Sequence, residues 1–301
     1  MFQSNSQVTY IMDRSVPPNT TNAQYHTYVT EEWNKLLGTP GIDEKQMQEF
    51  LEKHPCLLPF GEMPLGHGNN HPLSSAVVTQ PVLPGLKSKV PDFLYFTGNS
   101  GEITVVLIEI ESPGKKWFTK TGQQTAELTQ AANQISSWKA WFADPLNTQT
   151  FERDYMVRGY SALNNREFRQ KYILVIGRRD DITDTTLNRT RHHLQPVNET
   201  WMTYDRLTCS PHWDDAVTVK LDRSGVTPQF TVIHTPPMLR LGPSHYPNYS
   251  KLEGLEAAIE ANPLISRDRK NFLLKRIPYW RDWQTQTGGI ATVNGGDFSG
   301  E

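Results

Sequence analysis

Apolar residues in the middle of the chain follow the periods of strands and amphipathic helices. Segments 90–96 (VPDFLYF) and 102–111 (EITVVLIEIE) are rich in β-branched and aromatic residues and flank a TGNSG turn, which predicts a β-hairpin. A helix is predicted over 125–142, because apolar side chains recur there at helical spacing, and Asp144-Pro145 is expected to end it. The apolar side chains are Leu128, Ala131, Ile135, Trp138 and Phe142.

The segments before and after this hairpin and helix predict further helices and strands. A helix capped by Asp43, with Gln46 as its capping-box partner, is predicted to end before Pro55. The elements expected after the helix at 125–142 are a continuously apolar central strand at 171–177, a polar helix at 181–195 and a strand at 201–207. The order α, β, β, α, β, α, β predicts a mixed α/β sheet with a crossover unit.

The remaining segments give weaker patterns. The polar residues 1–29 predict an N-terminal arm, and the stretch 61–86, rich in Gly, Pro and Asn, predicts a loop. A C-terminal extension is expected over 211–285, with short strands at 217–221 and 230–235 and helices broken at Pro263. The glycine-rich segment 286–301 is expected to be disordered.

Composition narrows the class of protein. The 301 residues include 30 basic and 32 acidic side chains, a formal charge of −2, which excludes a polycationic coat protein but leaves room for a local nucleic-acid site. The two cysteines make no disulfide framework and fit a reducing compartment. Because the chain has no secretory pattern and no apolar run of roughly 18 residues, we expect a cytoplasmic protein without a membrane segment.

Three acidic residues mark the hairpin as the candidate site. Glu109 and Glu111 share one face of their strand, and the hairpin brings Asp92 alongside. Carboxylates that converge after an apolar run need a positive partner, and Mg²⁺ is the natural one. The alternative is a solvated strand end whose acids pair with nearby lysines. Those lysines are Lys115, Lys116 and Lys120.

The spacing of these acids resembles the core of the PD-(D/E)xK nucleases. Pro91-Asp92 precedes Glu109-Ile110-Glu111 by sixteen residues, and in that superfamily an Asp and a Glu hold Mg²⁺. Glu111 stands where the superfamily has its lysine, so Lys116 or Lys120 would supply the cation and Glu111 would act as an extra metal ligand or a base. Gln134, one helical turn before Trp138, resembles the Gln-x-x-x-Tyr motif of the RecB-like branch. The resemblance implies a restriction-endonuclease-like mixed sheet flanked by helices.

An ordered set of motifs narrows the resemblance further. FLEKHPCLLP, VPDFLYF, LIEIESPGKKWFTKTG, ELTQAANQISSW, KYILVIGRRDDI and MTYDRL occur in this order and together resemble the C-terminal nuclease domain of the Shedu antiphage family. The resemblance implies a nuclease domain over 30–210 that cleaves phage or foreign DNA, acts in defence and forms a homo-oligomer. It also implies Mg²⁺ as cofactor, with Mn²⁺ able to substitute, held by Asp92 and Glu109 with the Ile110 carbonyl as a further ligand.

Basic residues elsewhere are candidates for DNA contacts. The segment 267–276 has a local charge balance of 5 − 1 = +4, and Trp280 and Trp283 follow it. A solvated helix face with its aromatic residues in a core explains the same pattern. Arg178 follows the central strand and could contact phosphate, although Asp180 and Asp181 could neutralise it. The basic residues of the segment are Arg267, Arg269, Lys270, Lys275 and Arg276.

Two functions outside catalysis stay open. Because Glu111 replaces the lysine, the chain could be a catalytically inactive DNA-binding or scaffolding subunit of a defence complex. It could also be a protein-interaction module that uses its tryptophans as contact residues. A cleavage assay with Mg²⁺ against EDTA and a salt titration of DNA binding separate these functions.

Overall fold

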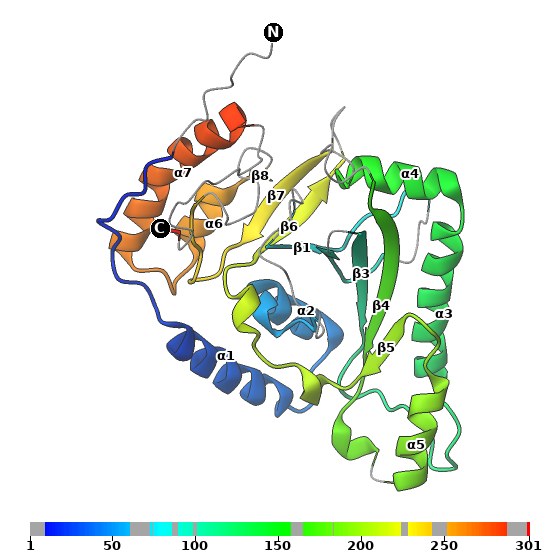
Figure 1. Cartoon of the computed structure of the whole chain (residues 1–301). Helices are drawn as coiled ribbons and strands as arrows, with labels where there is room; N and C mark the ends of the chain where they lie inside the picture. The colour runs from blue at the N-terminus through cyan, green and yellow to red at the C-terminus, as the bar shows by residue number, and fades with distance from the viewer. Residues whose placement is uncertain are drawn as a thin grey trace.

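A single mixed β-sheet organises the molecule. The computed structural model describes residues 10–60, 73, 75–85, 90–98, 101–157, 165–182, 184–223, 228–242, 252–287 and 300–301. Within these residues, eight strands form one sheet in the order β5-β4-β3-β2-β1-β6-β7-β8 (Figure 1). The strands are β1 (Ala76–Thr79), β2 (Phe93–Gly98), β3 (Glu102–Ile110), β4 (Glu167–Val175), β5 (Glu199–Met202), β6 (Val217–Asp222), β7 (Gln229–His234) and β8 (Leu252–Glu253).

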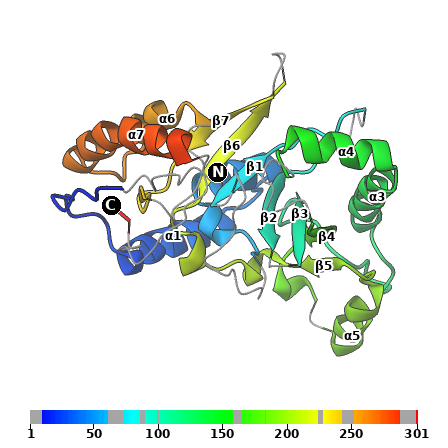
Figure 2. The same cartoon turned by 45° about the horizontal axis from the view of Figure 1, so that its top comes forward.

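Helices cover both faces of this sheet. They are α1 (Asn22–Leu37), α2 (Glu44–Lys53), α3 (Ala126–Phe142), α4 (Pro145–Asp154), α5 (Thr185–Leu194), α6 (Leu255–Ala261) and α7 (Arg267–Thr287). Short 3₁₀ turns are η1 (Pro55–Leu57), η3 (Arg179–Asp181), η4 (Tyr204–Arg206) and η5 (Pro211–Trp213). Figure 2 shows α5 at the β5 end of the sheet, apart from the other helices.

Strand alternation divides the core into two layers. In β3, Val105 and Leu107 pack with the apolar residues of α3, α4, α6 and α7. Val106 and Ile108, which point the other way, pack with those of α1 and α2. The sheet is therefore buried on both faces, which explains why its central strands are almost continuously apolar.

The mixed α/β fold predicted from the sequence is confirmed. β2 and β3 form the antiparallel hairpin, and β3, β4 and β5 run parallel to one another. Asp43 caps α2 and forms the capping box with Gln46, and the predicted apolar face of α3 is buried. These elements were predictable because each depends on a local period and a local cap.

Two local predictions were wrong, and a third was confirmed but incomplete. α1 begins at Asn22, inside the expected polar arm, because Thr21 and Gln24 form a capping box. β1 lies inside the expected loop 61–86, of which residues 61–72, 74 and 86 lie outside the described part of the chain. Asp144-Pro145 ends α3 but also starts α4, since Asp144 caps this helix and proline is well tolerated at its first position.

The C-terminal extension completes the sheet rather than forming a separate layer. β6 runs parallel to β1, and β7 and β8 continue the sheet from there. Glu301, expected in a disordered tail, is buried and its side chain pairs with Arg276 of α7. Residues 288–299 of that expected tail lie outside the described part of the chain. No helix in the described ranges has both the length and the apolar character needed to cross a membrane.

Candidate functional site

Asp92 and Glu109 lie side by side at one end of the hairpin. Phe93 pairs with Ile108 in the strand register, so Asp92, the residue before β2, lies beside the end of β3. The Asp92 backbone N–H donates to the Ile108 carbonyl at 3.0 Å, and the Ile110 N–H donates to Asp92 Oδ2 at 2.8 Å. The two carboxyl groups lie close enough for each to shift the pKa of the other. The hairpin therefore places them together, as the sequence predicted.

Burial makes both carboxyl groups of this pair difficult to ionise. Burial, followed by the charges of Glu44 and Glu111, raises the pKa of Asp92 to about 8. Burial and the neighbouring Asp92 raise the pKa of Glu109 well above its ordinary value. Glu109 is only 5% exposed, and its Oε2 atom is buried with no hydrogen-bond partner. A cation or a proton is therefore needed to balance the pair.

Lys115 contacts two acids that lie beside this pair. Its ammonium group contacts the Glu111 carboxylate, and its Nζ lies 3.8 Å from Glu44 Oε2 at the start of α2. Partial burial opposes the charge of Lys115, but the contacts with Glu111 and Glu44 outweigh it and raise the pKa of the lysine. Lys115 thus occupies the position against the acids that the sequence analysis gave to Lys116 or Lys120.

Lys116 and Lys120 lie elsewhere. The Lys116 Nζ is 3.4 Å from Asp181 Oδ1, and the Lys120 side chain is exposed in the loop before α3. Asp181 therefore engages Lys116, although the sequence offered that acid as a partner for Arg178. The structure places neither lysine against Glu111.

Tyr204 joins the site from η4 and was missed by the sequence analysis. Its hydroxyl is buried and has no hydrogen-bond partner within the described residues. Burial, followed by the charge of Asp92 and then of Glu44, Glu111 and Glu109, raises the pKa of Tyr204 well above its ordinary value. The hydroxyl therefore stays neutral beside the carboxylates. Its segment, MTYDRL, was interpreted as a strand, although the strand ends at Met202.

Gln134 lies on α3, the helix that covers the face of the sheet shared by Val105 and Leu107. Its side chain is partly exposed, whereas Trp138, one turn later, is fully buried. The shared helical face is confirmed, and the contact of Gln134 with phosphate or metal-bound water stays a prediction.

The carboxylates form a pair rather than the expected trio. Among the described residues, no three His, Cys, Asp or Glu side chains are placed to hold a metal ion. Glu111 is engaged by Lys115, which leaves Asp92 and Glu109. Such a pair suits Mg²⁺, which in proteins is commonly held by one or two carboxylates and completed by water and substrate phosphate. The unpartnered Glu109 oxygen is the atom that a cation would satisfy.

The Arg178 side chain forms hydrogen bonds within the protein. Its Nε and Nη2 donate to Asp205 Oδ1 at 3.0 and 2.9 Å, and its Nη1 donates to the Leu37 carbonyl at 2.9 Å. The guanidinium thus ties the loop after β4 to η4 and to the end of α1. The expected phosphate contact of Arg178 is replaced by these internal bonds.

Most basic side chains of segment 267–276 are also bonded within the protein. Arg269 is 2% exposed and donates to the carbonyls of Leu239 and Glu301, at 2.9 and 2.8 Å. Arg276 pairs with Glu301, and Trp280 and Trp283 belong to the core. The helix-and-core interpretation is therefore the correct one for most of this segment. Lys270 donates to the Glu260 carbonyl, and Arg267 pairs with the Glu260 side chain. Lys275 is exposed.

A comparison with protein families identifies similarity over the whole region that builds the carboxylate site. The family model described as Shedu protein SduA, C-terminal, matches residues 41–208, which is more than half of the chain. The match extends from the segment before α2 to just beyond η4, so it includes every residue placed above around the carboxyl pair. No curated protein matches the chain.

Proposed function

The chain belongs to the Shedu family of antiphage defence proteins, and on that premise we propose that it is a metal-dependent deoxyribonuclease that hydrolyses phosphodiester bonds. The observation that supports this activity is the buried, unpartnered Glu109 Oε2 beside Asp92. Burying two carboxyl groups without a cation is costly, so a divalent ion fits the site better than solvent does.

Each group around the pair has a proposed role. Asp92 and Glu109 would hold the ion, with the Ile110 carbonyl as a further ligand. Bound Mg²⁺ or Mn²⁺ would polarise the scissile phosphate and lower the pKa of a coordinated water. Lys115 supplies positive charge to the phosphate, and Glu111 orients the lysine through their ion pair. The neutral Tyr204 hydroxyl donates a hydrogen bond to an anionic oxygen.

Substitution of the two carboxylates tests this function. We expect Asp92→Asn and Glu109→Gln to lose cleavage of plasmid and linear DNA by at least ~10²-fold while keeping the fold, because loss of one electrostatic group at a reacting phosphate costs that much. Glu31→Gln, an exposed carboxylate on α1, is the matched control. The expected thermal shift with Mn²⁺ should also disappear in the two variants but not in the control.

The contrary results are equally specific. Wild-type cleavage rates in either variant, with metal supplied, would show that the site lies elsewhere. DNA binding without cleavage by the wild-type chain would favour the second candidate, an inactive DNA-binding or scaffolding subunit. The observation behind that candidate is Glu111, which stands at the lysine position of the nuclease motif and holds Lys115 in an ion pair. Assembly into a homo-oligomer stays a prediction.

A further inference from the structure

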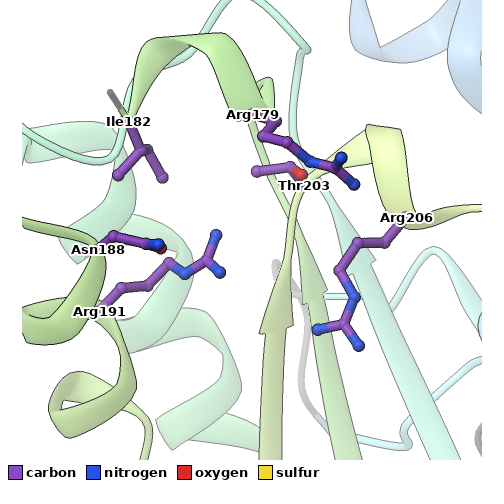
Figure 3. Close-up of a pocket in the computed structure, with 6 residues that line it drawn as sticks. All are labelled: Arg179, Ile182, Asn188, Arg191, Thr203 and Arg206. Carbon is purple, nitrogen blue, oxygen red and sulfur yellow. The ribbon is translucent and has the colours of Figure 1, made fainter. Parts of the chain in front are cut away.

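A second polar site lies beyond Tyr204, between α5 and the end of β5. A cavity of about 270 Å³ is lined by Arg179, Ile182, Asn188, Arg191, Thr203 and Arg206. Figure 3 shows Asn188 and Arg191 extending from α5 on one side, with Thr203 and Arg206 on the other and Arg179 above. Three separate elements thus contribute one guanidinium each: η3, α5 and η4.

The guanidinium groups repel one another, and the cavity offers them no acid. None of the described residues that line it is an Asp or a Glu. Burial, followed by the charges of Arg206 and Arg179, lowers the pKa of Arg191, and the Nε of Arg191 is buried with no hydrogen-bond partner. The ring of Trp117, with its centroid 5.3 Å from the guanidinium carbon, supports Arg191 from one side.

Three acids near the cavity are engaged elsewhere. Asp205 accepts from the Arg178 guanidinium and, at 2.6 Å, from the Arg179 backbone N–H. Asp181 pairs with Lys116. Asp184 caps α5 by accepting from the N–H groups of its first turn. These three acids therefore serve other partners, and the described residues that line the cavity carry positive charge only.

We propose that this arginine pocket binds a phosphate group carried by a nucleotide or by a nucleic-acid strand. A guanidinium group can form two parallel hydrogen bonds to phosphate oxygens. Three guanidinium groups carry more positive charge than the single negative charge of a carboxylate ligand would balance. Thr203 and Asn188 add a hydroxyl and an amide as neutral donors. Thr203 lines the pocket, and the next residue, Tyr204, is close enough to the carboxyl pair for its pKa to be raised by it, so one segment of chain links the two sites.

Binding, not cleavage, tests the pocket. The full chain is titrated with inorganic phosphate, followed by thermal shift, and with a short DNA duplex in EDTA, followed by fluorescence anisotropy at several salt concentrations. Arg191→Gln and Arg206→Gln are compared with Arg189→Gln, a matched control that is exposed on the same helix and does not line the pocket. Circular dichroism checks the fold, and Arg191→Lys, which keeps the charge, should restore part of the binding.

We expect phosphate to stabilise the wild type and the control but not the two pocket variants. If the phosphate belongs to a nucleic-acid strand, the pocket variants also bind the duplex at least tenfold more weakly, and their salt slope falls by about one. If only the phosphate shift is lost, the ligand is a free phosphate or a nucleotide. Unchanged phosphate and duplex binding in both folded variants would overturn the proposal. Asp92→Asn keeps the pocket, so its binding separates this test from the nuclease test.

Discussion

The Tyr204 hydroxyl shows how the site is organised at the scale of single residues. It is buried without a hydrogen-bond partner in the described structure, and four carboxyl groups lie close enough to raise its pKa. A buried hydroxyl without a partner costs stability of about 1–3 kcal/mol. This cost is offset only when an anionic ligand oxygen or a water accepts a hydrogen bond from it.

Tyr204→Phe therefore separates function from stability. We expect the variant to be as stable as the wild type or slightly more stable in urea unfolding, because the unsatisfied hydroxyl is gone. DNA cleavage should fall by about tenfold or more, as for the loss of a hydrogen-bond donor at a developing charge. Loss of stability, with cleavage unchanged, would show that the hydroxyl is structural.

The sequence predicted some of these residues and not others. Asp92 and Glu109 were predicted to meet because a hairpin fixes which residues face each other. Glu44 lies on α2 and Tyr204 on η4, both close enough to the carboxyl pair to interact with it. Their distance from the hairpin in sequence gave no pattern from which this proximity could be predicted. Lys115 was considered only as a partner of the acids, whereas its neighbour was given the catalytic charge. Arg269 was misjudged because a charge pattern does not show that a guanidinium is buried against backbone carbonyls.

At the scale of elements, α1 and α2 are joined through His54. This residue follows α2, and its Nδ1 lies 3.1 Å from the Tyr25 hydroxyl of α1. Burial, followed by the charges of Lys53 and His234, lowers the pKa of His54 from 6.5 to about 4. The imidazole is therefore packed between the helices in its neutral form.

The stability of this helix pair should depend on pH. Between pH 6.5 and about 4 the unfolded His54 holds a proton that the folded one does not, so stability falls as the pH falls through this window. The loss approaches roughly 3 kcal/mol at the low end, at ~1.4 kcal/mol for each pKa unit. Urea unfolding of the wild type and of His54→Gln from pH 7 to 4 measures it. Parallel pH profiles for the two proteins would contradict the assignment to His54.

Elements with a strong local period were predictable, and the short or shared ones were not. β1 has four residues among glycines and prolines, too few to show an alternation, and it becomes a strand because β2 and β6 flank it. Asp144-Pro145 was taken as a helix end because the residue before a proline is driven out of the helical region. The same pair starts α4, since an aspartate cap followed by proline is also a helix start.

At the scale of the whole molecule, the family match ends before the sheet does. The match stops at residue 208, whereas β6 pairs with β1, β7 and β8 continue the sheet from β6, and α6 and α7 cover one face. A chain cut after residue 208 would expose the free edge of β1 and the apolar layer beneath α7. The C-terminal extension is therefore part of the same folding unit.

Truncation tests this unity. We expect residues 1–208 to aggregate or to lose the cooperative thermal transition of the full chain, because an exposed apolar edge strand promotes association. Size-exclusion chromatography and circular dichroism of the truncated chain measure this. Adding residues 209–301 as a separate chain should recover soluble, folded protein. A monodisperse, cooperatively folded 1–208 would show that the matched region is a domain by itself.

The parallel pairing of β1 with β6 also determines when the sheet can be completed during synthesis. The β2–β3 hairpin leaves the ribosome early, but the neighbour of β1 is translated only after α5, η4 and η5. Pairing between strands so distant in sequence is slow and comes late in folding. A nascent chain interrupted before residue 217 has the carboxyl pair in its sequence but lacks β6, the strand that covers the outer edge of β1. Under the nuclease function proposed above, we expect such incomplete chains to leave the DNA of the cell that makes them uncut.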